Sequence, residues 1–226
     1  MFLRILNLLY PRLCFACNKQ NVSKDQTICL SCEYKITPTT YHKMPENPIS
    51  ERFYGRVKIN RASSAFSFVK GGLLQDLIHS LKYENKPEIG IELGKIYGAV
   101  LKEDEFWKTI DYIVPVPLHE KKKHQRGYNQ AAMWGKGLSE SLGIPLNENL
   151  LIRTDYTESQ TKKSRLERFQ NVQDVFAVPN PALLAGKKIL LVDDVLTTGA
   201  TIEACSLKLL AAADTEISVV CIALAN

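Results

Sequence analysis

Short apolar runs alternate with amphipathic segments through the last three quarters of the chain, as is typical of alternating strands and helices. The apolar runs predict buried strands, at 62–69, 111–118, 149–152, 189–192 and 217–224, with a hairpin or edge strand at Val175, Phe176 and Val178. The amphipathic segments predict helices, at 73–82, 89–101, 130–142 and 201–213. This order predicts an α/β domain with a doubly wound, mostly parallel sheet over residues 61–226.

Four cysteines near the N-terminus form two Cys-x2-Cys pairs, Cys14 with Cys17 and Cys29 with Cys32. Each pair can form a tight knuckle whose thiolates point to one side, and two knuckles complete a tetrahedral zinc site. Four thiolate ligands leave no open coordination position for water. So small a module needs a bound metal or a disulfide to fold. We therefore expect a structural zinc ion, with a disulfide or a vestigial site as the alternatives.

Three parts follow from these patterns. We expect an N-terminal helix and zinc module over 1–40, a linker or wrapped loop over 41–60, and the α/β domain over 61–226. The apolar segment 1–10 is too short to span a bilayer, so we expect a short amphipathic helix on the body, or else a weak membrane or partner contact. No other stretch is long and apolar enough, which predicts a cytoplasmic protein without stable membrane insertion.

Composition changes this picture only slightly. With 226 residues, 45% hydrophobic and 23% charged, the chain is typical of a globular protein and not of a disordered one. The net charge of +5 suits an anionic ligand, although it does not by itself indicate nucleic-acid binding.

Two adjacent carboxylates and a Thr/Gly loop follow the apolar run 189–192, just before the helix at 201–213. The ligand-binding residues expected here are Asp193, Asp194, Val195, Leu196, Thr197, Thr198, Gly199, Ala200 and Thr201. Open α/β sheets bind ligands at the carboxyl ends of their strands, and such a loop can hold a phosphate with backbone N–H groups. Because the carboxylates would repel that phosphate, they must face hydroxyl groups or a cation. A sugar phosphate satisfies both halves.

Two basic segments could hold a second anionic group. The first follows the strand 111–118, and its expected pyrophosphate-binding residues are Pro117, Leu118, His119, Lys123, Arg126 and Gly127. The second lacks an apolar period, as active-site lids often do, and its candidates are Arg153, Thr157, Gln160, Arg165, Arg168 and Asn171. The alternative for both is a solvated surface loop. Lys82, at the end of the helix 73–82, is either a partner of the helix dipole or a contact to an anion.

Together these segments fit 5-phosphoribosyl 1-pyrophosphate with Mg²⁺, because the ligand carries a phosphate, a diol and a pyrophosphate. Asp193 and Asp194 would be the catalytic groups, since their charge can stabilise the positive sugar left when pyrophosphate departs. A closing lid would exclude water.

The stretch 189–201 resembles the phosphoribosyl-pyrophosphate motif of type I phosphoribosyltransferases in its apolar strand, both acids, and Thr198, Gly199 and Thr201. Nearly the whole chain is similar to the ComF family, and the residues that carry this resemblance are the runs 114–119 and 126–131, Thr157, Gln160, Arg168, Asn171 and the four N-terminal cysteines. The resemblance implies a zinc module fused to a fold of the type I phosphoribosyltransferase kind. It also implies a role in DNA uptake, natural competence or single-stranded DNA handling, with single-stranded DNA and DNA-uptake or recombination proteins as partners.

The sequence departs from these patterns at two places. Lysines occupy positions 121–123, where the family usually spaces arginines, and Thr197 stands where purine phosphoribosyltransferases carry a further acid. Two alternative functions therefore remain: a catalytically active phosphoribosyltransferase acting on an unidentified nucleobase or amine, and a scaffold whose zinc module recruits a partner beside a vestigial site.

Overall fold

A computed structural model describes residues 11–24, 26–154 and 175–225. The predicted N-terminal helix and five of the predicted lid residues, Thr157, Gln160, Arg165, Arg168 and Asn171, lie outside the described residues. Among the residues that it describes, no helix has the length and apolar character needed to cross a membrane.

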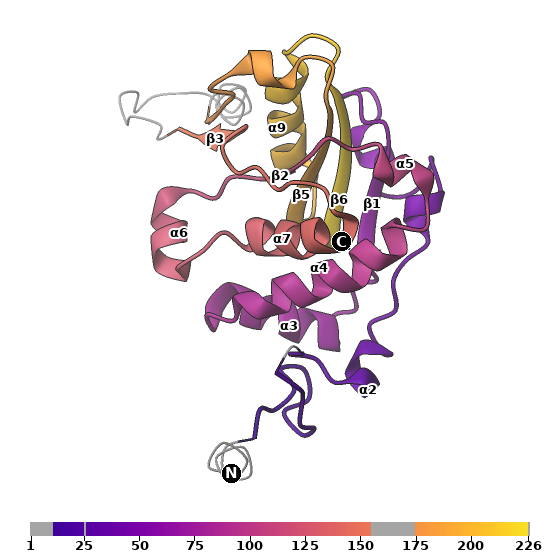
Figure 1. Cartoon of the computed structure of the whole chain (residues 1–226), viewed down its shortest axis with the longest axis vertical. Coiled ribbons are helices and arrows are strands. Elements are labelled where there is room, and N and C mark those ends of the chain that lie inside the picture. The colour runs from indigo at the N-terminus through magenta and orange to yellow at the C-terminus, as the bar shows by residue number, and fades with distance from the viewer. Residues whose placement is uncertain (1–10, 25, 155–174, 226) are drawn as a thin grey trace.

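The body is built on a four-stranded parallel sheet in the order β1-β6-β5-β2 (Figure 1). Its strands are β1 Ala62–Phe66, β2 Tyr112–Pro115, β5 Lys188–Leu196 and β6 Glu216–Leu224. The apolar runs of β5 and β6 lie at the centre because both of their faces are covered, as expected of a parallel sheet. The predicted α/β fold with a parallel sheet is therefore confirmed.

Helices cover both faces of this sheet (Figure 1). One face carries α3 Leu73–Tyr83, α4 Pro87–Leu101 and α7 Gln130–Leu142, and the other carries α9 Ala200–Leu210. Along β5 the side chains alternate, so that Leu190 and Val192 face the first group and Leu191 faces α9. Shorter helices complete the body, α2 Leu30–Glu33, α5 Glu105–Lys108, α6 Glu120–Arg126, η1 Tyr41–Lys43, η2 Ser50–Phe53 and η3 Pro181–Leu184.

Helices α4 and α7 cross in close contact because both carry glycine at the crossing. A Cβ atom on Gly94 would lie 2.4 Å from the carbonyl oxygen of Trp134, and one on Gly137 would lie 2.0 Å from that of Ile91. Only a residue without a side chain fits at either position. This crossing fixes α4 on α7, and α7 in turn packs on β2 and β5.

The segment 41–60, for which we expected a linker or a wrapped loop, packs on the body. Ile49 and Phe53 are buried in the α9-side core, and the Asn47 amide donates to the Ala62 carbonyl at 2.9 Å. The segment therefore wraps the sheet, while the three domain boundaries remain a prediction.

Several expectations about local structure were wrong in their bounds or type; among them, the strand at 111–118 ends at Pro115 and the helix at 201–213 ends at Leu210. The strand at 62–69 ends at Phe66, and that at 149–152 becomes β3 Ile152–Arg153, which pairs antiparallel with β4 Phe176–Ala177 as the predicted hairpin. The strand at 189–192 continues through both acids to Leu196. The expected basic loop is mostly the helix α6. His119 caps α6 by accepting from the Lys121 N–H at 3.1 Å, and a run of Glu, Lys, Gln and Arg favours helix once capped.

Candidate functional site

Asp193 and Asp194 lie at the carboxyl end of β5, half-buried beside the start of α9. Each carboxylate is held by the next backbone N–H: Asp193 accepts from Asp194 at 2.8 Å, and Asp194 accepts from Val195 at 2.5 Å. Burial and, to a smaller extent, the neighbouring charge of Asp194 together raise the pKa of Asp193 to about 8. The pair therefore holds its charge at a cost, which a hydroxyl-rich or cationic ligand would relieve.

Lys82 reaches this acid pair from α3. Its ammonium Nζ lies 3.0 Å from Asp194 Oδ2, and the two side chains are only 21% and 15% exposed. Of the two roles left open for Lys82 by the sequence, the structure favours contact with an anion, and that anion is a carboxylate of the site itself.

The loop between β5 and α9 combines exposed hydroxyls with a left-handed glycine. Thr197 and Thr198 are exposed, and Gly199 adopts φ 81°, a left-handed conformation that turns the chain into the first turn of α9. The Thr198 hydroxyl accepts from the Ala200 N–H at 3.4 Å. Exposed hydroxyls and N–H groups at the start of an eleven-residue helix suit a phosphate.

The segment 41–60, which wraps the body, also contacts this loop. The sequence did not indicate that contact. Arg56 donates to the Thr198 carbonyl at 2.9 Å and pairs with Glu203 in the first turn of α9. A Cβ atom on Gly199 would lie 3.0 Å from the Phe53 ring, so this glycine is needed for space as well as for conformation. The two arginines of the segment, Arg52 and Arg56, were the only available signal in a polar stretch.

The end of β2 lies beside the acids, because the Val116 N–H donates to the Val192 carbonyl at 2.9 Å. The predicted pyrophosphate residues that follow are spread over α6 and its ends. Arg126 donates to Gln130 at 2.8 Å and lies 5.3 Å above the Tyr83 ring. Gly127 ends α6 with φ 80°.

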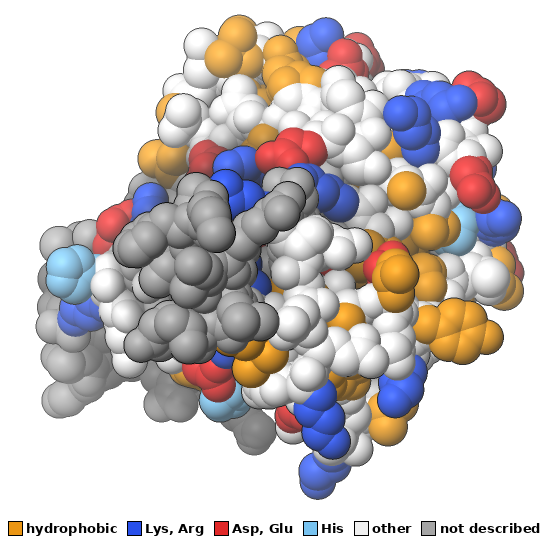
Figure 2. All heavy atoms as spheres, turned by 60° about the horizontal axis from the view of Figure 1, so that its bottom comes forward, with side chains coloured by type: hydrophobic (Ala, Val, Ile, Leu, Met, Phe, Trp, Pro, Cys, Tyr) orange, Lys and Arg blue, Asp and Glu red, His pale blue; other side chains and the backbone are white. Residues whose placement is uncertain are grey.

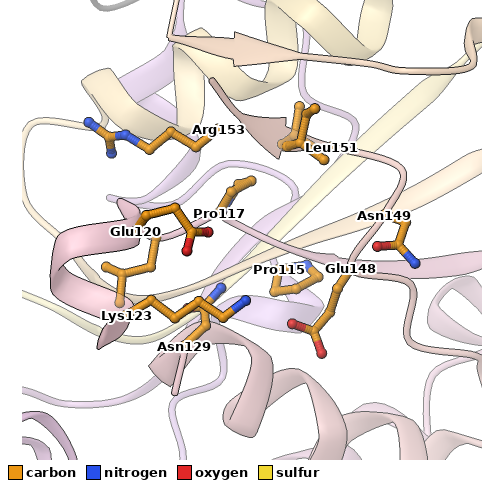
Figure 3. A pocket seen from close by; sticks show the side chains of 11 residues that line it. Pro115, Pro117, Glu120, Lys123, Asn129, Glu148, Asn149, Leu151 and Arg153 are labelled. Carbon is orange, nitrogen blue, oxygen red and sulfur yellow. The ribbon is translucent and has the colours of Figure 1, made fainter. Parts of the chain in front are cut away.

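A cavity of about 360 Å³ separates α6 from the segment that leads into β3 (Figure 3). The predicted residues Pro117, Leu118, Lys123 and Arg153 line it, but the two acids do not. Figure 3 shows Glu120 and Lys123 extending from α6 into the space opposite Glu148. The sequence did not identify either glutamate, because an acidic residue in a basic or polar surface segment carries no distinctive signal.

The four N-terminal cysteines converge as predicted. The Sγ atoms of Cys14, Cys17, Cys29 and Cys32 all lie within 4.8 Å of one another, and three of the residues are buried. N–H groups of Lys19 and Gln20 bond to the Cys17 sulfur and lower the pKa of that thiol to about 6. A tetrahedral zinc ion, with sulfur ligands about 2.3 Å away, fits four such thiolates. All four cysteines are free thiols, which does not favour the disulfide alternative.

The cysteine module is fixed to the body through α4 and Lys86, the residue before that helix. The Glu92 carboxylate of α4 accepts from the Thr27 N–H, from the Thr27 hydroxyl and, at 3.2 Å, from the Ile28 N–H. Lys86 lies 4.8 Å above the Phe15 ring. The module is therefore held against the first half of α4 and the residue that precedes it.

Lysine and arginine side chains form several separate groups on the face seen in Figure 2, with acidic and hydrophobic side chains between them. On α6, Lys121, Lys122 and Lys123 are exposed next to one another. The described part of this face therefore offers short basic patches and not one continuous basic surface.

Two family models match the chain: the phosphoribosyl transferase domain over residues 128–226 and the double zinc ribbon domain over residues 5–43. Competence protein F of Haemophilus influenzae is 35% identical over 133 residues, which cover 57% of this chain and 58% of that protein. DNA utilization protein YhgH of Escherichia coli is 30% identical over 132 residues, 57% of each chain. Competence protein ComFC of Bacillus subtilis is 26% identical over 196 residues, 79% of this chain and 75% of that protein. The chain thus matches little more than half the length of the first two relatives.

Proposed function

The chain belongs to the ComF/YhgH family of competence and DNA-utilisation proteins, with a phosphoribosyltransferase domain and an N-terminal double zinc ribbon, and from this premise we propose that it binds 5-phosphoribosyl 1-pyrophosphate with Mg²⁺. One observation carries the proposal: two half-buried acids lie near the carboxyl end of β5, a few residues before the glycine loop that opens α9. Acids suited to a diol and a loop suited to a phosphate are thereby only a few residues apart.

Each part of the ligand has a partner in this arrangement. The ribose hydroxyls donate to Asp193 and Asp194, which relieves the repulsion between the two carboxylates. The 5-phosphate accepts from N–H groups and hydroxyls of residues 197–201. Lys123, at the cavity beside β2, supplies charge for the pyrophosphate. Mg²⁺ would supply positive charge that screens the phosphate oxygens, and Asp193 and Asp194 would be the residues that hold it, directly or through water.

The test is isothermal titration of the wild type with 5-phosphoribosyl 1-pyrophosphate, with and without Mg²⁺. We expect saturable, Mg²⁺-dependent binding, weakened about 10- to 100-fold in Asp194→Asn, because a bond to a charged acceptor is lost. The control is Glu216→Gln, because Glu216 lies at the opposite end of the sheet. Glu203→Gln on α9 is unsuitable, since Glu203 pairs with Arg56 at the loop. No binding by the wild type would refute the proposal, and equal binding by Asp194→Asn would refute the role of the acids.

We further propose that the chain takes part in DNA uptake, natural competence or the handling of single-stranded DNA. The names of the relatives support this role, and so do the three exposed lysines of α6. Fluorescence anisotropy with a labelled single-stranded oligonucleotide should show binding that weakens steeply with salt. Lys121→Ala/Lys122→Ala should reduce the salt slope by about 1.4, because each contact to a single strand contributes about 0.7, whereas Lys95→Ala on α4 should leave it unchanged. Salt-independent binding, or none, would contradict the proposal.

A second candidate function is transfer of the phosphoribosyl group to an acceptor, for which the cavity between α6 and β3 is the supporting observation. Its volume of about 360 Å³ lies within the range of small-ligand sites. In such a reaction Asp193 and Asp194 would stabilise the positive charge that develops on the sugar as pyrophosphate leaves. Release of pyrophosphate in the presence of a panel of nucleobases and amines would support transfer, and release at the rate of simple hydrolysis would contradict it.

A further inference from the structure

Lys82 pairs its ammonium with one of the two acids of the candidate site, and both side chains of the pair are mostly covered. It follows the buried Leu81 by one position near the end of α3, so it points away from the apolar face of that helix and towards the carboxyl end of the sheet. Its ammonium lies beside Asp194. Because side chains alternate along a strand, Asp194 faces the same side of the sheet as Leu190 and Val192, which is the side that α3 covers. Both partners are mostly covered, in contrast to exposed pairs such as Lys95 with Glu140.

The end of α3 is held in place by the last residue of α6 and by the segment just after that helix. The Tyr128 hydroxyl donates to the Leu81 carbonyl at 2.5 Å, and the Tyr83 ring lies under the Arg126 guanidinium. Lys82 stands between these two contacts in the chain. Its position is therefore tied both to the acid pair and to the segment that we expect to bind pyrophosphate.

A helix-dipole role does not account for this geometry. A lysine that only interacts with the carbonyl end of a helix can leave its flexible side chain in solvent. Here the side chain of Lys82 is ordered over a carboxylate and mostly covered, which costs conformational freedom and hydration. Such a cost is typical of a charge held for a ligand.

An ammonium group has three N–H donors, and the described structure gives the Lys82 ammonium one partner, Asp194 Oδ2. The remaining donors are available to oxygens that approach at the carboxyl end of β5. A compact ammonium charge suits phosphate oxygens, which surround it without a fixed planar geometry.

We propose that Lys82 is a ligand-contacting residue of the sugar-phosphate site: it neutralises Asp194 and donates to a phosphate oxygen at the pyrophosphate end of the ligand. This assignment rests on the proposed function. It explains how a polyanion can bind beside two carboxylates. Lys82 lies outside both the loop 197–201 and the α6 segment, and its positive charge offsets the repulsion between the carboxylates and the phosphates. The ligand class is a pentose phosphate that carries a second, anomeric phosphate group.

The first test is titration of 5-phosphoribosyl 1-pyrophosphate and of ribose 5-phosphate into the wild type, Lys82→Met and Lys82→Arg. Lys82→Met should weaken binding of the pyrophosphate ligand about 10- to 100-fold, and Lys82→Arg should restore most of it, because the charge is kept. Ribose 5-phosphate, which lacks the anomeric phosphates, should lose much less affinity. Lys95→Met removes an ion-paired surface lysine from α4 and serves as the matched control. Circular dichroism verifies the fold of each variant.

The second test separates direct contact from an effect through Asp194. In an Asp194→Asn background, a direct contact predicts that Lys82→Met still weakens binding of the pyrophosphate ligand. No further loss in that background, or equal losses for both ligands, would overturn the proposal while leaving the proposed function intact. Absence of binding by the wild type would instead refute the proposed function. Should Lys82→Met fail to fold, Lys82→Gln in the same two backgrounds gives the same readouts.

Discussion

Glu92→Gln should weaken zinc binding although Glu92 contacts no zinc ligand atom. Its carboxylate accepts three hydrogen bonds from Thr27 and Ile28, the two residues directly before Cys29. A glutamine keeps the shape but offers one acceptor oxygen and no charge. Bonds to charged groups contribute about 1.5–3 kcal/mol each, so losing the charge and one acceptor should cost about 2 kcal/mol. That corresponds to about a 30-fold weaker zinc complex, within the range seen when outer partners of metal ligands are removed.

The assay is competition for zinc against a chromogenic chelator at fixed pH, followed by metal analysis of the recovered protein. Glu88→Gln is the control, because Glu88 lies one turn earlier on the same face of α4 and its side chain makes no hydrogen bond among the described residues. A Glu92→Gln protein that holds zinc as tightly as the wild type would refute the coupling. An equal loss in Glu88→Gln would show that α4 charge, and not the contact to the module, matters.

Three further changes test the packing and electrostatics of the body. Gly137→Ala places a Cβ atom 2.0 Å from the Ile91 carbonyl oxygen. It should lower the free energy of unfolding, measured by urea denaturation, by about 3 kcal/mol. A decrease of less than about 1 kcal/mol would contradict the close crossing of α4 and α7. Burial lowers the pKa of His42 below its usual 6.5. Stability should therefore fall as the pH drops below 6.5, where the imidazole of the unfolded chain takes up a proton before that of the folded chain. His42→Phe should flatten this acidic limb of a plot of Tm against pH, and an unchanged limb would contradict the prediction. Burial raises the pKa of Asp193 to about 8, so its contribution to stability is lost as pH rises from about 4 to 8; Asp193→Asn should raise the Tm at pH 9, and a lower Tm there would contradict this sign.

The α/β class could be predicted because strands buried on both faces leave continuous apolar runs, as 189–192 and 217–224 do. The cysteine cluster was predictable for a similar reason, since its spacing alone brings four thiols together. Local boundaries were less accurate. The polar run 120–126 was expected to be a loop, because a short exposed helix has no apolar face to reveal it.

Contacts between distant segments could not be read from sequence. Arg56 and Phe53 brace the glycine loop across 142 and 146 positions of chain, and no local pattern indicates such a partner. Lys82 posed the same difficulty: its place at a helix end was clear, but its pairing with Asp194 depends on how α3 packs on the sheet. These tertiary contacts turn the acid pair into a site with its own counter-charge.

The most direct test of the central claim is a crystal structure of the chain grown with 5-phosphoribosyl 1-pyrophosphate and Mg²⁺. We predict the ribose hydroxyls within hydrogen-bond distance of Asp193 and Asp194, and the 5-phosphate on the loop 197–201 at the start of α9. A ligand bound elsewhere, or one that places its pyrophosphate on the loop 197–201, would contradict the account.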